Sequence, residues 1–203
     1  MNKKFDPNKI SRKEILNYLN QSSEVAEYQL TLIDEIAKVS EMCIETLNSG
    51  GKIIFCGNGG SASDSQHLAA ELIGRFMKNR KPIPAISINT DTSVLTSLSN
   101  DFGYEHIFSK QISALGQSGD VLLAITTSGN STNVIQAVEA AHNKNMTVIA
   151  LSGRDGGKLA PHLQESDIEI RVEADKTSRI QEIHLLIIHC LCDIIDHKIF
   201  QTP

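Results

Sequence analysis

The chain has 203 residues, of which 40% are hydrophobic and 21% are charged, a composition typical of a soluble globular protein. This length suits a single domain whose core is large enough to fold without disulfides or metals. The net charge of −5 argues against a dedicated nucleic-acid binder, because such proteins normally present a basic face.

The first predicted element is a long helical segment at residues 8–49. Its apolar residues recur at three- and four-residue steps and give one apolar stripe. The stripe consists of Leu30, Ile33, Ile36, Val39, Cys43 and Leu47. Glycines at positions 50 and 51 end the helix. We assign residues 1–50 to an N-terminal helical extension that covers its own domain or a neighbouring subunit, and residues 51–203 to the main domain.

From residue 52 onward, short apolar strands alternate with helical segments. The predicted strands are residues 52–56, 85–88, 121–125, 146–151 and 168–172. Helices are predicted at 63–77, 92–99, 104–115, 131–144, near 157–163 and at 178–197. This alternation predicts a doubly wound α/β domain, a five-stranded parallel sheet with helices on both faces. The short basic stretch at residues 78–81 is most simply a solvated loop.

The last predicted helix is apolar on almost every side. Its apolar residues are Ile180, Ile183, Leu185, Leu186, Ile187, Ile188, Leu191, Ile194 and Ile195. A helix of this kind is buried on all sides. In a chain of this length the expected cover is another subunit, so we predict an oligomer.

The sequence also bears on the compartment of the protein. Residues 1–7 are polar and lack an apolar signal core, and no run approaches the roughly 20 apolar residues of a membrane span. The four cysteines form no CxxC pair and no disulfide framework, which is typical of core thiols in a reducing compartment. We expect a cytoplasmic protein with neither a membrane nor a nucleic acid as partner.

A glycine-rich loop, Gly57–Ser63, follows the first predicted strand, at the sheet edge where open parallel sheets bind ligands. Its glycines let the backbone approach a ligand, and the next helix offers free N–H groups to an anion. Taken alone, the loop can also be a tight strand-to-helix turn with a serine cap. It matches neither a Walker loop nor GxGxxG, which argues against a nucleotide cofactor.

A hydroxyl-rich loop, Thr126–Ser131, follows the third predicted strand and carries four hydroxyls in six residues. It can wrap a phosphate without any lysine or arginine, although a lone turn of this kind is often only a helix cap. Two such loops after two separate strands together predict a phosphorylated small molecule as the ligand.

Two helices contribute candidate titratable residues. His67 and Glu71 are four residues apart and share one helix face. The spacing suits two ligands of one metal, an acid–base pair or a surface hydrogen-bonded pair. His184 and His189 lie in the apolar last helix, where an isolated histidine is more often a satisfied core residue, with Gln181 upstream.

Taken together, four segments resemble the SIS (sugar isomerase) family, and within it the enzymes that isomerise a phosphorylated heptose. They are CGNGGSASDSQHLAAELIGRF at 56–76, SNDFGYEHIFSKQISALGQSGDVLLAITTSGNS at 99–131, LSGRDGG at 151–157 and RIQEIHLLIIHCLCDIID at 179–196. The resemblance implies a flavodoxin-like sheet and a homotetramer. It also implies conversion of sedoheptulose 7-phosphate to D-glycero-D-manno-heptose 7-phosphate, the first step of bacterial heptose synthesis for surface polysaccharide.

The resemblance also implies a role for each matching residue. Glu71 and His189 are the implied acid and base residues. Substrate contacts are implied for Asn58, Gly59, Gly60, Ser61, Glu71, Asn100, Asp101, Thr126, Thr127, Ser128, Ser131 and Gln181. One zinc ion per subunit is implied, with His67, Glu71, Gln181 and His189 as ligands, and no nucleotide cofactor. Asn100 and Asp101 can also form a plain turn, and Ser178, where some relatives carry Asp, receives no role.

The implied chemistry requires a base that moves a proton between C1 and C2 through an enediol, and a donor for the developing oxyanion. Glu71 suits the first task and His189 the second. Direct ligation to zinc would weaken a carboxylate as a base, so the two implied roles of Glu71 compete.

Other functions remain open at this point. Non-catalytic SIS tetramers that bind the bacterial replication initiator share the pattern IPAISINTD at residues 83–91 and the HCLCDIID tail. That branch loses the residues equivalent to Glu71 and His189 and disrupts the Asn-Gly-Gly loop, whereas this sequence retains them all. A sugar-phosphate sensor without turnover and an isomerase of another sugar phosphate are further alternatives.

Overall fold

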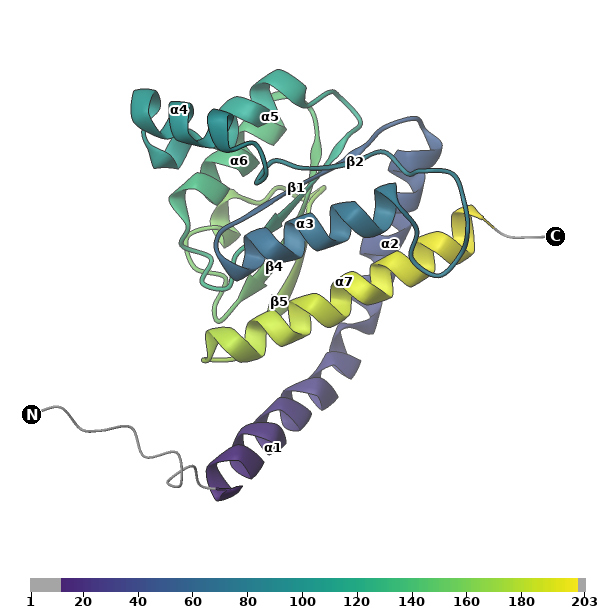
Figure 1. Cartoon of the computed structure of the whole chain (residues 1–203), viewed down its shortest axis with the longest axis vertical. Coiled ribbons are helices and arrows are strands. Elements are labelled where there is room, and N and C mark those ends of the chain that lie inside the picture. Colours follow the sequence, from purple (N-terminus) through teal and green to yellow (C-terminus); the bar gives the residue numbers. More distant parts are fainter. Residues whose placement is uncertain (1–11, 201–203) are drawn as a thin grey trace, which may run out of the picture.

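The computed structural model describes residues 12–200 and has one parallel sheet between two layers of helices (Figure 1). The strands are β1 (Ile53–Gly57), β2 (Ala85–Ser87), β3 (Val121–Ile125), β4 (Thr147–Gly153) and β5 (Ile168–Val172). All neighbouring strands run parallel, in the order β2-β1-β3-β4-β5. This order confirms the predicted five-stranded, flavodoxin-like doubly wound sheet.

Helices cover the two faces of the sheet. One face packs against α2 (Ile33–Asn48), α3 (Gly60–Ile73) and α7 (Thr177–Ile199). The other face packs against α4 (Thr92–Phe102), α5 (Ser109–Leu115) and α6 (Thr132–Asn143). Short 3₁₀ turns lie at Gln29–Leu32, Tyr104–His106 and Ala160–His162, and α1 (Arg12–Tyr28) extends away from the sheet (Figure 1).

The central strands send alternate side chains to two separate cores. In β1, Ile53 and Phe55 face α3 and α7, whereas Ile54 and Cys56 face the layer that contains α6. All four side chains are buried, as expected for parallel strands that are covered on both faces. The strands therefore read as continuous apolar runs and were predictable from the sequence.

The N-terminal helical segment is not the single helix that the apolar stripe predicts. A 3₁₀ turn at Gln29–Leu32 separates α1 from α2, and residues 8–11 lie outside the described part of the chain. The tighter turn changes the phase of the helix. As a result Val39 and Cys43 are buried in the core, while Leu30 and Ile33 are exposed. The predicted division between residues 50 and 51 stays a prediction.

Most of the apolar surface of the last helix is covered by other elements of its own chain. The prediction that another subunit supplies this cover is therefore wrong. Most of the apolar residues of the helix belong to the core under α2 and α3, and Leu185 and Leu186 remain exposed. The last helix packs against both α2 and α3, which cover the same face of the sheet. Within residues 12–200, no helix combines the length and the apolar character that crossing a membrane requires.

The loop after α3 also differs from the prediction. The helix ends at Ile73 instead of residue 77, and its last backbone hydrogen bond runs from the N–H of Gly74 to the carbonyl of Ala70 at 2.9 Å. Residues 78–81 do form a loop, but Arg80 in it is not solvated. Its side chain is 1% exposed and pairs with Asp196 of α7. The sequence does not distinguish Arg80 from its basic neighbours, because only the fold shows which of these side chains is buried.

His184 of α7 is the core histidine that the apolar surroundings predict. It is fully buried, and its Nε2–H donates to the carbonyl of Ser152 at 2.8 Å. Burial lowers the pKa of His184 from 6.5 to about 4, although the hydrogen bond to Ser152 opposes this change. The folded protein therefore holds this imidazole neutral.

We predict an acid-dependent loss of stability from His184. The unfolded chain takes up a proton near pH 6.5 that the folded chain binds only near pH 4, so stability falls as the pH drops through this window. The loss attributable to this group is on the order of 3 kcal/mol. Urea unfolding at fixed protein concentration measures it. His184→Gln, which keeps an N–H donor but does not titrate, should lose correspondingly less; equal losses would contradict the prediction.

Candidate active site

The two loops singled out from the sequence meet at the point where the strand order reverses. β1 and β3 are neighbours in the sheet, and Gly57 at the end of one pairs with Ile125 at the end of the other. Asn58 and Thr126 are the next residues of the two strands, so both loops start side by side at the carboxyl edge. Ligands of open parallel sheets bind at this position.

Asn58 ties the first loop to the N-terminal turn of α6. Its amide exchanges two hydrogen bonds with the amide of Asn133, at 2.8 and 2.9 Å, and its Oδ1 also accepts from the hydroxyl of Tyr104 at 3.0 Å. Sequence reasoning did not single out Tyr104 or Asn133. The one local signal for Asn133 is its place two residues after Ser131, in the first turn of the next helix.

The glycines of the first loop have different tasks. Gly59 has a φ of 56°, a left-handed conformation that other residues rarely adopt. Gly60 touches α7, because a Cβ at this position would lie 1.9 Å from the Nε2 of Gln181. Ser61 is buried behind the loop, against Gly57. The loop therefore brings Gln181 onto the first turn of α3.

The second loop is closed by its own hydroxyls. Thr126 is buried, and its Oγ1 lies 3.2 Å from the Oγ of Ser131. The Oγ of Ser128 accepts from the N–H of Asn130 at 3.1 Å, and Thr127 and Ser128 are half-buried. The loop rests on a second glycine turn, since a Cβ at Gly129 would lie 2.0 Å from the carbonyl oxygen of Gly156. A rigid cradle of N–H and O–H groups results, which suits an anion.

Three titratable side chains meet between α3 and α7. The Nε2 atoms of His67 and His189 lie 3.1 Å apart, with the two rings nearly perpendicular. The Nδ1 of His67 lies 3.8 Å from the Oε1 of Glu71. One nitrogen of His67 thus faces His189 and the other faces Glu71, so His67 stands between the two implied catalytic groups.

Two further residues border this cluster. The ring of Phe76 stacks on His189 with the ring centroids 6.1 Å apart, which holds the imidazole plane. Asp64 lies one turn before His67, and burial raises the pKa of its carboxyl while the neighbouring His67 opposes this rise. Sequence reasoning missed both residues, because neither stands at a spacing that suggests chemistry.

Asn100 and Asp101 lie at the C-terminal end of α4. Both are exposed, and the Nδ2 of Asn100 donates to the Oδ1 of Asp101 at 2.8 Å. Tyr104, three residues further on, links this region to Asn58, because its hydroxyl donates to the Oδ1 of Asn58.

A cavity of about 570 Å³ opens beside the loops, on the side of α6. Of the implied site residues, Asn58 and Ser131 line it, together with Tyr104 and Asn133. The titratable cluster belongs to the other layer of helices. The cavity and the cluster thus occupy two sides of the same sheet edge.

The donor set can be compared with the requirements of zinc. Two nitrogens that bind one tetrahedral zinc ion at about 2.0–2.1 Å lie about 3.3 Å apart. The 3.1 Å between His67 and His189 fits this requirement. Glu71, in contrast, faces the other nitrogen of His67, and within residues 12–200 no group of three or more His, Cys, Asp and Glu residues is arranged to hold a metal ion.

Comparison with known proteins adds independent information. A family model described as the SIS domain matches residues 17–153. A phosphoheptose isomerase of Chromohalobacter salexigens is 54% identical over 187 residues, which cover 92% of this chain and 95% of that protein. The phosphoheptose isomerase of Shewanella sp. (strain ANA-3) is 57% identical over 169 residues, 83% of this chain and 86% of that protein.

A solved structure agrees with these relatives. The phosphoheptose isomerase from Neisseria gonorrhoeae is 46% identical, with a TM-score of 0.87. The match covers 91% of this chain and 98% of that one.

Proposed function

This chain belongs to the SIS domain family, and we propose that it is an aldose–ketose isomerase that converts sedoheptulose 7-phosphate to D-glycero-D-manno-heptose 7-phosphate. The observation that carries the proposal is the meeting of Glu71, His67 and His189 beside two anion-binding loops. Relatives that match most of this chain are named phosphoheptose isomerases, which favours turnover over binding to a replication initiator. The reaction would be the first step of heptose synthesis.

The acid–base chemistry follows from the cluster between α3 and α7. In the ketose, C2 carries the carbonyl, so the base must remove a proton from C1 and the enediol must be protonated at C2. Glu71 is the proposed base. His189 is proposed to hydrogen bond the sugar oxygens as charge develops and to pass a proton between them. His67 holds His189 from one side, and Phe76 holds it from the other.

The binding of the phosphate and of the sugar chain follows from the loops. The hydroxyl-rich loop and the N-terminus of α6 are proposed to hold the phosphate, since both offer donors without a competing charge. The remaining sugar hydroxyls are proposed to meet side chains and backbone of the surrounding loops. The full proposed set is Asn58, Gly59, Gly60, Ser61, Glu71, Asn100, Asp101, Thr126, Thr127, Ser128, Ser131 and Gln181.

Zinc is a further proposal. We propose that one ion per subunit is held by His67, Glu71, Gln181 and His189, and the separation of the two imidazole nitrogens supports it. A bound ion would supply a Lewis acid for the sugar oxygens.

We also propose a cytoplasmic location. All four cysteines are free thiols, as expected in a reducing compartment. Burial raises the pKa of Cys43 and of Cys56 to about 12, so both thiols stay protonated and unreactive.

The first prediction for the reaction concerns Glu71→Gln. Removal of the base should lower kcat by about 10²- to 10⁴-fold while KM changes little, because the amide keeps the shape of the side chain. Incubation with sedoheptulose 7-phosphate, followed by NMR of the aldose product, measures both constants. Glu45→Gln, on an exposed position of α2, serves as the matched control and should retain full activity. Absence of turnover by the wild type, with or without added zinc, would refute the proposed function.

The second prediction concerns the metal. Protein that is purified without chelator and supplemented with zinc should contain about one zinc ion per subunit by elemental analysis. The double variant His67→Ala/His189→Ala should lose it, because both nitrogen ligands are gone. His162→Ala, which changes an exposed residue that pairs with Glu139 of α6 in the other layer of helices, should retain it. An equal zinc content in the two variants would remove these ligands from the proposal.

The third prediction concerns the proposed homotetramer, which exposed apolar residues support. Leu16 and Leu19 of α1 are each 58% exposed, and Leu186 of α7 is 45% exposed. We expect light scattering to give a mass about four times the 22.2 kDa of one chain. Leu16→Glu/Leu19→Glu should reduce this mass, whereas Asn17→Glu in the same helix should not. A monomer at micromolar concentration would contradict the tetramer.

A further inference from the structure

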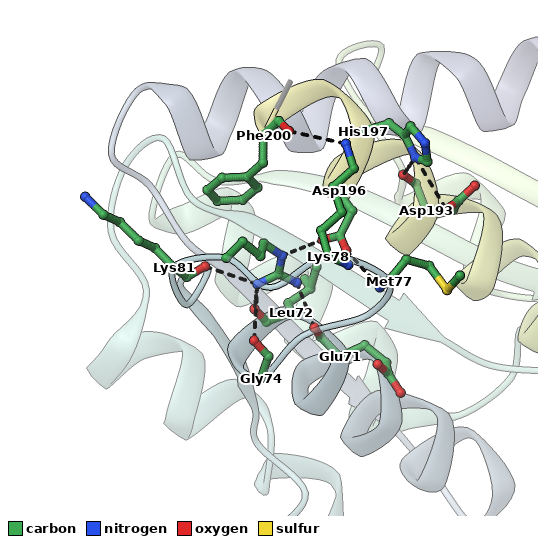
Figure 2. Close-up of polar contacts among 11 residues, drawn as sticks. Glu71, Leu72, Gly74, Met77, Lys78, Lys81, Asp193, Asp196, His197 and Phe200 are labelled. Atoms are coloured by element: carbon green, nitrogen blue, oxygen red, sulfur yellow. Dashed lines mark hydrogen bonds and ion pairs between the residues drawn. The ribbon is translucent and has the colours of Figure 1, made fainter. Parts of the chain in front are cut away.

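A buried ion pair between Arg80, in the loop after α3, and Asp196 of α7 links the C-terminal ends of the two helices. Figure 2 shows Asp196 and the backbone carbonyls around this pair. The side chains of Arg80 and Asp196 are 1% and 0% exposed, and the Nε of Arg80 donates to the Oδ1 of Asp196. The Oδ2 of Asp196 accepts from the backbone N–H groups of Met77 and Lys78 at 3.1 and 3.3 Å. These hydrogen bonds lower the pKa of Asp196 against the effect of burial, so the pair stays charged.

The same guanidinium also binds the end of the helix that carries the base. Its Nη2 donates to the carbonyl of Glu71 at 2.8 Å, and its Nη1 donates to the carbonyl of Leu72 at 2.7 Å (Figure 2). The last carbonyls of a helix lack partners within the helix, and a cation there is favoured by the helix dipole. Arg80 therefore caps α3 at the backbone of Glu71 itself.

This contact is the last of three that align α3 with α7. Gly60 meets Gln181 at the start of the two helices, and His67 meets His189 seven and eight residues later. Asp196 follows His189 by another seven residues, about 10 Å along the helix axis. The contacts occur in the same order on both helices, so the helices run in the same direction. Glu71 lies four residues after the second contact on α3, and its own carbonyl takes part in the third.

Stability alone does not account for the ion pair. The cost of desolvating two charges offsets much of their attraction, and apolar groups of similar volume often stabilise a core as well. The guanidinium instead fixes the relative orientation of the groups that it binds, because its N–H donors lie in one rigid plane. Here the plane reaches a carboxylate of α7 and two carbonyls of α3 together.

We propose that Arg80 and Asp196 are positioning residues for the isomerisation, which hold Glu71 of α3 in the orientation that faces the substrate beside His189 of α7. The proposal rests on the proposed roles of Glu71 and His189. Neither residue of the pair touches the substrate; both act through the backbone of Glu71. A displacement of about 1 Å at a catalytic group can lower a rate about 10²-fold, so a small shift of the helix end suffices.

Single substitutions test the proposal by the division of their effect between kcat and KM. Asp196→Asn keeps the shape and an acceptor but loses the charge, and Arg80→Lys keeps the charge but loses the planar fork. Both should lower kcat by about 10- to 100-fold, with KM within about threefold of the wild type. Lys52→Met is the matched control. It breaks an ion pair with Asp120 at the amino ends of β1 and β3, away from the loops of the candidate site, and should lower stability without changing kcat.

A paired apolar replacement separates positioning from stability. Arg80→Met/Asp196→Leu removes both charges together, so urea unfolding should show more stability than in either single variant. Under the proposal kcat stays low, because no donor reaches the carbonyl of Glu71. Recovery of wild-type kcat together with stability would reduce the pair to a structural role and overturn the proposal.

A crystal structure of Asp196→Asn gives a readout that does not depend on turnover. Under the proposal the side chain of Glu71 shifts relative to His67 and His189, whose Nε2 atoms are 3.1 Å apart in the wild type. An unchanged cluster would overturn the proposal. If the wild type showed no isomerase activity, the proposed function would fail, and this structure would still decide whether the ion pair positions Glu71.

Discussion

The parallel packing of α3 against α7 is the contact on which the site depends. Two residues of the titratable cluster, His67 and Glu71, lie on α3, and the third, His189, lies on α7. Gly60 lets the two helices approach, since any side chain there would displace Gln181. Below the cluster, Leu68 of α3 and Ile188 of α7 share one apolar core on the sheet. This core fixes the distance between the helices, but apolar contacts are non-directional and do not fix the rotation that aims Glu71. The hydrogen bonds of Arg80 to Asp196 and to the carbonyls of Glu71 and Leu72 are directional, and under our proposal they supply that constraint.

The sheet order adds a second constraint. Because the order reverses between β1 and β3, their loops diverge toward different layers of helices and leave the carboxyl edge open. The amide pair of Asn58 and Asn133 crosses this edge and joins the two layers. In the proposed binding mode, the reacting carbons of the sugar phosphate meet the cluster of Glu71, His67 and His189 in one layer, and its phosphate meets the N-terminus of α6 in the other.

The sequence predicted the features that depend on local pattern. Buried parallel strands are continuous apolar runs, and the close spacing of His67 and Glu71 places them on one helix face whatever the fold. The tertiary partners were out of reach, because spacing within one helix does not reveal which helix lies opposite. Arg80 shows the limit most clearly. It looks like its solvated basic neighbours in the sequence, and only the turn after Gly74 carries it under α7.

The geometry of His67 bears on the competition between the two roles implied for Glu71. Its Nε2 faces His189, whereas its Nδ1 faces the carboxylate, so one ring separates the two groups. A carboxylate at the second nitrogen of a metal-binding histidine commonly fixes the tautomer and the orientation of the ring. In this conformation the carboxylate of Glu71 faces Nδ1 of His67, and Nε2 of the same ring faces His189. Under the proposed mechanism Glu71 is the base, and the ion pair at the end of α3 contacts the backbone of this same residue through the guanidinium of Arg80.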